Sequence, residues 1–305
     1  MTGPHDRNSG PFWPRAADIG QLDGGVNRIQ PRARAIRYEG PILRTKGEPS
    51  VADDRKKRGF RMPPRAAAAP GLWLYGHHAV ASALANPRRH IKRLVLTARA
   101  AATIDKSLLA RAQPEITDGD AVGRLLPPGA VHQGLALNCN PLPQLDLSTI
   151  APKRDGIRRI VVVLDQISDP QNTGAILRSA AAFGVVAAIV QDRHAPPESG
   201  ALAKAASGAL DVIPYITVVN IARTLKELEE LGFWRVALAG DGDTPLKDAV
   251  STGDIALVLG SEGSGLRRLV RENCDVAAFV PSQSQMESLN VSNAAAIALY
   301  ECRRD

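Results

Sequence analysis

The sequence predicts an α/β protein whose C-terminal half is built on a parallel sheet. From residue 158 onward, short apolar runs alternate with helical segments, a pattern typical of parallel α/β domains. The run Ile160–Leu164 is continuously apolar, as expected for a strand that is buried on both faces. Residues 71–142 predict a smaller α/β unit, whereas residues 1–70 show neither a helical nor a strand period. We therefore expect two folded domains behind an N-terminal extension.

The first 70 residues predict a disordered basic extension. They contain nine of the 22 prolines of the chain and few apolar residues in any regular spacing. Their 14 basic and seven acidic side chains account for the whole formal net charge of +7, so residues 71–305 are neutral overall. This charge fits a flexible arm that attracts phosphate. The alternatives are a solubilising tail and a misassigned start site.

The composition argues against metal-binding, disulfide-rich and membrane-spanning classes of protein, and it indicates a cellular compartment. The three cysteines, Cys139, Cys274 and Cys302, form no CxxC pair, so we expect neither a metal site nor a disulfide framework. No apolar run approaches the roughly 20 residues that span a bilayer, and no signal-peptide core follows Met1. We expect a cytoplasmic protein that is not associated with a membrane. The mitochondrial matrix is a minor alternative, because transit peptides avoid the acidic residues present here.

The small unit over residues 71–142 is expected to mix strands and short helices. Its helix ends before Asn86-Pro87, because a residue that precedes proline disfavours helical backbone. The predicted segments are a start at Leu72–Leu74, a helix over His77–Leu84, a strand over Ile91–Leu96, a short helix over Ser107–Ala112 and a strand over Leu135–Asn138. Residues 143–157 are rich in proline and charge and predict a linker.

The larger domain, residues 158–305, predicts the parallel sheet. After Ile160–Leu164, further strands are predicted over Ala187–Val190, Val236–Ala239, Ile255–Leu259 and Val276–Val280. Helices are predicted over Asn172–Phe183, Ala222–Leu231 and Val291–Arg303. Ligands of such sheets bind at the carboxyl ends of the strands. The residues that follow Leu164, Leu259 and Val280 are therefore candidates for a site.

The segment DPQNTGAILRSA follows the first of these strands. Asp169-Pro170 predicts a turn, and Asn172 is a candidate helix cap. Gly174 lies in the first helical turn, where it indicates close approach of a backbone or a ligand. Arg178 follows six residues after Asn172 and, taken alone, is compatible with an ordinary surface arginine.

Two more segments follow the later strands. LGSEGSGL, from Leu259 to Leu266, holds three glycines that allow a backbone to wrap around a ligand. Its spacing matches neither a phosphate-binding Walker loop nor a dinucleotide fingerprint, so a plain strand-to-helix turn is the alternative. The third segment gathers short polar side chains before the last helix, more than capping requires. These are Ser288, Asn290, Ser292 and Asn293.

In their order and spacing, DPQNTGAILRSA, LGSEGSGL and VP…SLNVSNAAAI resemble the signature of the SpoU (TrmH-type) family of RNA ribose 2′-O-methyltransferases, within the SPOUT superfamily. The resemblance covers residues 71–303. GLWLYGHHAVASAL and Gly129–Gly134 resemble the N-terminal substrate-binding domain of the RlmB-like branch, which methylates a guanosine of 23S ribosomal RNA. One departure is that Val280-Pro-Ser-Gln-Ser-Gln lacks the glycine of the IPM-x-G stretch found in many members, which affects the shape of the cofactor loop.

The resemblance implies a fold, a cofactor and partners. The C-terminal α/β domain is expected to hold a deep trefoil knot, behind a small α/β RNA-binding domain. S-adenosyl-L-methionine is expected to sit in the knot, held mainly by backbone groups of Gly260, Val280 and Leu289. The partners are expected to be large-subunit ribosomal RNA and a second copy of the chain in a homodimer, with the site near the subunit interface.

The resemblance also implies which residues take part in catalysis. Arg178 is the residue expected to be essential; a guanidinium stays protonated, so we expect it to position the ribose or phosphate and to stabilise a developing alkoxide. Asn172 is expected to orient Arg178 or the ribose, and Glu262 to hold the arginine or share the proton. Ser288 and Asn290 complete the polar wall. RNA contacts are expected from a basic cluster that is equally compatible with a solvated face, namely Arg88, Arg89, Lys92 and Arg93.

Three other functions remain as alternatives. A transfer-RNA 2′-O-methyltransferase of the same family is disfavoured by the 71–142 domain, which that branch lacks. An RNA-binding protein without catalysis is disfavoured because the motif residues are intact. A nicotinamide-dependent oxidoreductase is disfavoured by the glycine spacing and by the late position of the glycine-rich loop. The nucleotide modified, and whether naked RNA or a ribosomal particle is the substrate, are not encoded in these motifs.

Overall fold

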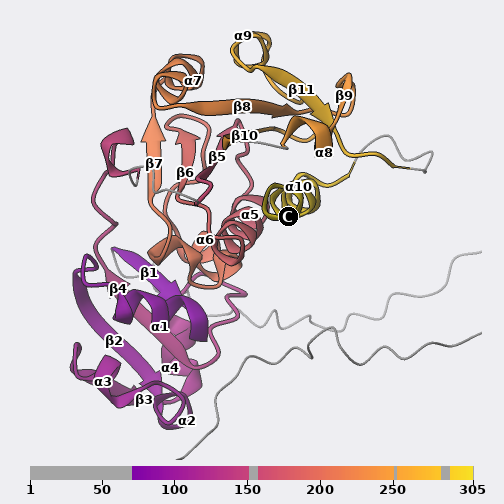
Figure 1. The fold of residues 1–305 in the computed structure, drawn as a ribbon. Coiled ribbons are helices and arrows are strands. Elements are labelled where there is room, and N and C mark those ends of the chain that lie inside the picture. The colour runs from indigo at the N-terminus through magenta and orange to yellow at the C-terminus, as the bar shows by residue number, and fades with distance from the viewer. Residues whose placement is uncertain (1–70, 151–156, 251–252, 283–288, 305) are drawn as a thin grey trace, which may run out of the picture. The chain divides into compact units, whose positions relative to one another are not determined.

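The computed structural model describes residues 71–150, 157–250, 253–282 and 289–304, all within one compact unit of residues 62–305. These residues form two sheets with their helices (Figure 1). The predicted basic extension and part of the predicted linker lie outside the described residues. Among the helices of the described part, none is long and apolar enough to cross a membrane.

Within this compact unit, the first sheet and its helices form what we call the N-terminal unit. Its sheet is mixed and four-stranded, in the order β1-β4-β2-β3. Strand β4 pairs antiparallel with β1 and β2, and β3 adds in parallel to β2. The strands are β1 Leu72–Tyr75, β2 Ile91–Thr97, β3 Pro114–Thr117 and β4 Leu135–Cys139. The helices are α1 His77–Ala85, α2 Ala98–Ala101, α3 Lys106–Leu109 and α4 Gly119–Arg124. The predicted helix and the strands over 91–96 and 135–138 are confirmed. The second predicted helix is a single turn, whereas α2, β3 and α4 were not predicted.

The C-terminal unit is a seven-stranded sheet in the order β7-β6-β5-β10-β8-β11-β9, and every pair is parallel, as predicted. The strands are β5 Ile160–Asp165, β6 Ala187–Gln191, β7 Tyr215–Val218, β8 Phe233–Leu238, β9 Thr244–Pro245, β10 Asp254–Gly260 and β11 Val276–Phe279. The helices are α5 Pro170–Ala182, α6 Gly200–Ala206, α7 Ile221–Glu230, α8 Leu246–Ala249, α9 Arg268–Glu272 and α10 Val291–Arg303. Single 3-10 turns are η1 Leu147–Thr149 and η2 Ala209–Asp211. The trefoil knot remains a prediction.

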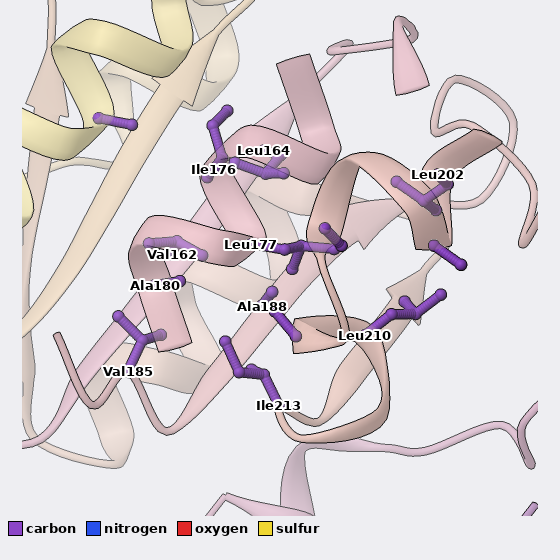
Figure 2. Packing of buried hydrophobic residues seen from close by; sticks show 14 of the residues in the cluster. Val162, Leu164, Ile176, Leu177, Ala180, Val185, Ala188, Leu202, Leu210 and Ile213 are labelled. Carbon is purple, nitrogen blue, oxygen red and sulfur yellow. The ribbon is translucent and has the colours of Figure 1, made fainter. Parts of the chain in front are cut away.

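Strand β5 is buried on both faces, which explains its continuous apolar sequence. On one face, Val162 and Leu164 pack with apolar residues of α5, α6 and α10. On the other face, Val161 and Val163 pack with residues of α7 and α9. Figure 2 shows the first of these layers, in which side chains of α5 lie over β5 and β6. The sheet is therefore a central layer between helices.

The start of α5 differs from the prediction in a way that matters for the site. Asp169 is the N-cap, and its carboxylate accepts hydrogen bonds of 3.1 Å from the backbone N–H groups of Gln171 and Asn172. Pro170 occupies the first helical position, where its fixed φ and missing N–H are tolerated. The prediction that Asn172 caps the helix is therefore wrong. Its side chain is left available for other partners.

Gly174 allows α5 and α6 to pack closely. A Cβ atom at this position would lie 2.4 Å from the Cβ of Ala205, and 2.8 Å from the backbone nitrogen of Ala206. Of the two explanations predicted for this glycine, close approach of a backbone is the one observed.

Arg89 of the N-terminal unit forms buried ion pairs with the parallel-sheet unit. Its side chain is fully buried, and its Nε donates to Oδ1 of Asp211 at 2.9 Å. It also forms an ion pair with Glu198, and Nη1 donates to the carbonyl of Asn140 at 3.2 Å. Asn86 adds a 3.0 Å hydrogen bond to Oδ1 of Asp211. Buried charges are tolerated only when they are paired in this way.

This packing corrects the predicted RNA-contacting cluster. Arg89 is buried in the junction and cannot reach RNA. Arg93 is exposed and forms a bidentate ion pair with Glu115 of β3, with contacts of 2.8 and 2.7 Å. Arg88 and Lys92 remain as exposed cations of the set.

Candidate active site

The three predicted segments meet at one edge of the parallel sheet. Strands β5 and β10 are direct neighbours, and their last residues, Asp165 and Gly260, are paired in register. Helix α5 begins five residues after Asp165, and the glycine-rich loop begins at Gly260. The carboxyl ends of parallel strands, where ligands of such sheets bind, therefore bring these two segments together. Helix α10, which packs against α5, brings the third segment to the same edge (Figure 1).

Asn172, Glu262 and Asn290 form a hydrogen-bonded cluster at this edge. Oε1 of Glu262 accepts from Nδ2 of Asn172 at 3.2 Å and from Nδ2 of Asn290 at 2.5 Å. Nδ2 of Asn290 also donates to Oδ1 of Asn172 at 3.1 Å. Each member thus contacts the other two, although they come from three separate segments of the chain. We call these three residues the polar cluster.

The start of α10 stabilises the charge of the polar cluster. Asn290 is the N-cap of α10, and its Oδ1 accepts from the backbone N–H of Ser292 at 2.9 Å. The backbone N–H of Val291 donates to Oε1 of Glu262 at 3.3 Å. The carboxylate of Glu262 therefore lies at the positive end of the helix dipole and accepts hydrogen bonds from three N–H donors. Asn290 serves both as helix cap and as cluster member.

The glycine-rich loop is a tight closed turn. Ser261 and Gly265 exchange two backbone hydrogen bonds, of 3.2 and 3.0 Å. Gly263 and Gly265 have φ angles of 86° and 65°, in the left-handed region that glycine adopts without strain. A Cβ atom at Gly260 would lie 2.2 Å from the carbonyl carbon of Gly265. Glycine at position 260 is therefore required for the loop to fold back onto the end of β10.

An ion pair that was not predicted holds the far end of this loop. Asp165 is completely buried, and its carboxylate accepts from the backbone N–H of Arg267 at 3.1 Å. Nε and Nη2 of Arg267 donate to Oδ1 of Asp165 at 2.9 and 2.6 Å. The loop is thus tied to β5 as well as to β10. An acid at the end of a buried strand was a possible signal for this pair, but its partner lies 102 residues away.

A cavity of about 910 Å³ opens beside the loop, between the ends of β8, β10 and β11 and the start of α10. All three predicted cofactor-binding residues, Gly260, Val280 and Leu289, line it, and so does Glu262. Its volume lies in the range of sites for small molecules and cofactors. Among the described residues, no group of three or more His, Cys, Asp or Glu side chains is arranged to hold a metal ion.

Two charged residues in the cavity lining were not predicted. Asp241 follows β8, and Arg271 lies on α9. Nη1 of Arg271 donates to both carboxylate oxygens of Asp241, at 2.9 and 2.7 Å. Hydrogen bonding from Arg271 lowers the pKa of the Asp241 carboxyl. Neither residue lies in a recognisable motif, so only the tertiary structure identifies them.

The structure does not bring Arg178 into this arrangement. Its side chain is exposed on α5, and it does not line the cavity. None of the side-chain hydrogen bonds and ion pairs formed within the described ranges involves Arg178. Six residues separate it from Asn172, so at 3.6 residues per turn the two side chains leave α5 in different directions. Ser288, the remaining predicted catalytic residue, lies outside the described residues.

Comparison with known proteins identifies both units. Residues 159–300 match the model of the SpoU rRNA methylase family, and residues 73–145 match that of the RNA 2′-O ribose methyltransferase substrate-binding domain. Both matches fall on the units described above.

Individual relatives support the same grouping. The chain is 38% identical over 242 residues to the 23S rRNA (guanosine-2′-O-)-methyltransferase RlmB of Xylella fastidiosa. The aligned region covers 76% of this chain and 96% of that protein. The chain is 43% identical over 175 residues to RlmB of Coxiella burnetii, covering 57% of this chain and 70% of that protein. The solved structure of the SpoU methyltransferase AviRb from Streptomyces viridochromogenes superposes with a TM-score of 0.64 at 23% identity, over 76% of this chain and 88% of that one. This last likeness establishes the fold.

Proposed function

The chain belongs to the SpoU rRNA methylase family, and from that premise we propose that it transfers a methyl group from S-adenosylmethionine to the ribose 2′-hydroxyl of a guanosine in 23S ribosomal RNA. The observation that carries the proposal is the polar cluster, in which three separate segments converge beside a cavity of cofactor size. RNA-binding and oxidoreductase functions do not require that arrangement.

The cavity fits the cofactor. A closed glycine loop presents backbone groups to it, and Gly260, Val280 and Leu289 supply a largely apolar wall. When bound, S-adenosylmethionine supplies a methyl group activated by the positive charge on its sulfur. Glu262, which lines the cavity, provides a negative charge that complements it.

The polar cluster would position the ribose. A 2′-hydroxyl is a weak nucleophile until its proton is shared, and the carboxylate of Glu262 can accept a hydrogen bond from it. Asn172 and Asn290 hold that carboxylate and offer amide groups to the ribose. Correct orientation alone can contribute about 7–11 kcal/mol to lowering such a barrier. Ser288 adds a further hydroxyl to this wall in the proposal.

Arg178 and a homodimer belong to the same proposal. Helix α10 exposes Ile297 and Tyr300, one turn apart, and Leu289 is exposed near its start. Exposed apolar side chains in such an arrangement favour contact with another protein surface. A second copy that covers the outer faces of α5 and α10 carries its own Arg178 to this surface. In that arrangement, Arg178 of one copy would reach the polar cluster of the other copy, although it does not contact the polar cluster of its own chain. There the guanidinium would hold a phosphate and stabilise developing charge on oxygen.

The substrate is selected outside the cluster in this proposal. The N-terminal unit matches a substrate-binding domain, and Arg88 and Lys92 offer exposed cations on it. The excess of basic residues in 1–70 adds attraction to phosphate that depends on salt. We place the activity in the cytoplasm, where unpaired thiols such as the buried Cys139 and Cys302 remain reduced.

Nucleoside analysis tests the proposal. The purified chain is incubated with S-adenosylmethionine and either unmodified 23S ribosomal RNA or unmodified transfer RNA, and the RNA is then digested and analysed by mass spectrometry. The proposal requires 2′-O-methylguanosine from the ribosomal RNA. The same nucleoside from transfer RNA alone would transfer the activity to the other branch of the family.

A further inference from the structure

The ion pair between Asp241 and Arg271 lies at the cavity, and Nη2 of Arg271 also donates to the backbone carbonyl of Asp241 at 3.5 Å. Its side chains are 74% and 39% exposed, respectively. Ion pairs with this exposure add about 0–1 kcal/mol to stability, because water and salt screen them. The pair nonetheless occupies the lining of the same cavity as Gly260 and Glu262. Binding is therefore a better explanation of its position than folding.

The charges of the cavity complement those of the cofactor. Among the described residues, three charged side chains line it, namely Asp241, Glu262 and Arg271, and these three together carry one net negative charge. S-adenosylmethionine carries a sulfonium, an ammonium and a carboxylate, and thus one net positive charge near neutral pH. Glu262 already accepts hydrogen bonds from Asn172 and Asn290 in the polar cluster. The two remaining charged residues are Asp241 and Arg271. The carboxylate of Asp241 is complementary to the ammonium of an amino acid, and the guanidinium of Arg271 is complementary to its carboxylate.

We propose that Arg271 binds the α-carboxylate, and Asp241 the α-ammonium, of the methionyl part of S-adenosylmethionine. The inference rests on the proposed function, since it assumes that this cofactor occupies the cavity. Without ligand, the two side chains satisfy each other. With ligand, each exchanges part of that contact for a charged partner, and the planar guanidinium is suited to a carboxylate. The amino-acid end of the cofactor is thereby recognised by side chains, whereas the glycine loop offers backbone groups.

Calorimetric titration of the full chain with two nucleosides tests this assignment. S-adenosylhomocysteine carries the amino-acid group, whereas 5′-methylthioadenosine keeps the adenosine and the sulfur but lacks that group. Arg271→Ala and Asp241→Asn are compared with wild type. The matched control is Arg268→Ala on the same helix, whose side chain pairs with Glu272 and does not line the cavity. Thermal unfolding of each variant verifies that it is folded.

For Arg271→Ala we expect about 10-fold to 100-fold weaker binding of S-adenosylhomocysteine, the effect of losing a charged hydrogen-bond partner. Binding of 5′-methylthioadenosine should change by less than about twofold, a difference below 0.5 kcal/mol. Asp241→Asn should show the same selectivity, and Arg268→Ala should bind both like wild type. Equal losses for both nucleosides, or no loss for either, overturn the assignment while leaving the proposed function intact. If wild type binds neither nucleoside, the proposed function itself fails.

Discussion

Nδ2 of Asn290 donates a 3.1 Å hydrogen bond to Oδ1 of Asn172, a contact that spans 118 residues of sequence. Both amides also donate to the same oxygen of Glu262. The three side chains therefore fix one another, and the cap of α10 is linked to the first turn of α5. Because members of such a network act as a unit, a change in one member is expected to disturb the others.

Glu262→Gln removes the charge of the polar cluster while nearly preserving its shape. We expect methyl transfer to slow by about 100-fold or more, because the amide is a poor acceptor for the ribose proton and leaves the developing charge unsupported. Single-turnover transfer rates at saturating cofactor measure the effect. Glu272→Gln on α9 is the control, since that carboxylate pairs with Arg268 at the surface. Full activity of Glu262→Gln would remove Glu262 from the mechanism.

Gly260→Ala should weaken cofactor binding. The added Cβ would lie 2.2 Å from the backbone of Gly265, so the loop could no longer close on β10. Titration with S-adenosylhomocysteine is expected to show at least a tenfold loss of affinity, or about 1.4 kcal/mol. The control is Gly119→Ala, where a Cβ has open space within 4 Å. Normal affinity of Gly260→Ala would show that the closed loop is dispensable.

Arg89→Ala should destabilise the folded chain strongly. The substitution leaves the buried carboxylate of Asp211 without its cation, and loss of one partner from a buried ion pair costs about 3–5 kcal/mol. Urea unfolding measures the change in free energy. Lys92→Ala, an exposed lysine of the neighbouring strand, should stay within about 0.5 kcal/mol of wild type. A loss below about 1 kcal/mol for Arg89→Ala would mean that the junction is open to water.

Mixed dimers test where Arg178 acts. Arg178→Ala and Glu262→Gln are each expected to be inactive alone. If Arg178 serves the partner's polar cluster, random mixing of the two variants creates some intact sites, and roughly a quarter of wild-type activity returns in a two-fold symmetric dimer. If Arg178 serves its own chain, every site carries a defect and mixing restores nothing. The control is a sample in which the two variants are combined without exchange of subunits.

Strands β5 and β10, at the centre of the parallel sheet, could be predicted because each contains a continuous apolar run that is buried on both faces. Helix α6 and strand β7 escaped prediction. Helix α6, GALAKAA, is too short and alanine-rich to show a clear apolar face, and β7 is four residues long at the sheet edge. Local pattern carries little information for elements of this length.

The candidate site was partly predictable for a related reason. Its motifs follow strand ends, which identified the segments, and the resemblance to the SpoU family then named Asn172, Glu262 and Asn290 within them. The sequence offered Asn172 as a candidate N-cap. Asp169 and Pro170 are nevertheless residue types favoured at the N-cap and at the first helical position, and they occupy these positions in α5. Asp241 and Arg271 could not be found, because their relation exists only once β8 and α9 are packed. The same holds for the buried role of Arg89, whose carboxylate partners, Asp211 and Glu198, lie more than 100 residues away.

The most direct test is methyl transfer from labelled S-adenosylmethionine to the ribosomal RNA of a strain that lacks this gene, with wild type and Arg178→Ala compared side by side. We predict that wild type labels one ribose of the large-subunit RNA and that Arg178→Ala, folded and able to bind the cofactor, transfers about 100-fold more slowly or not at all. Absence of label with wild-type protein that binds the cofactor would contradict the assignment to 23S ribosomal RNA. Equal labelling by both proteins would contradict the role of Arg178.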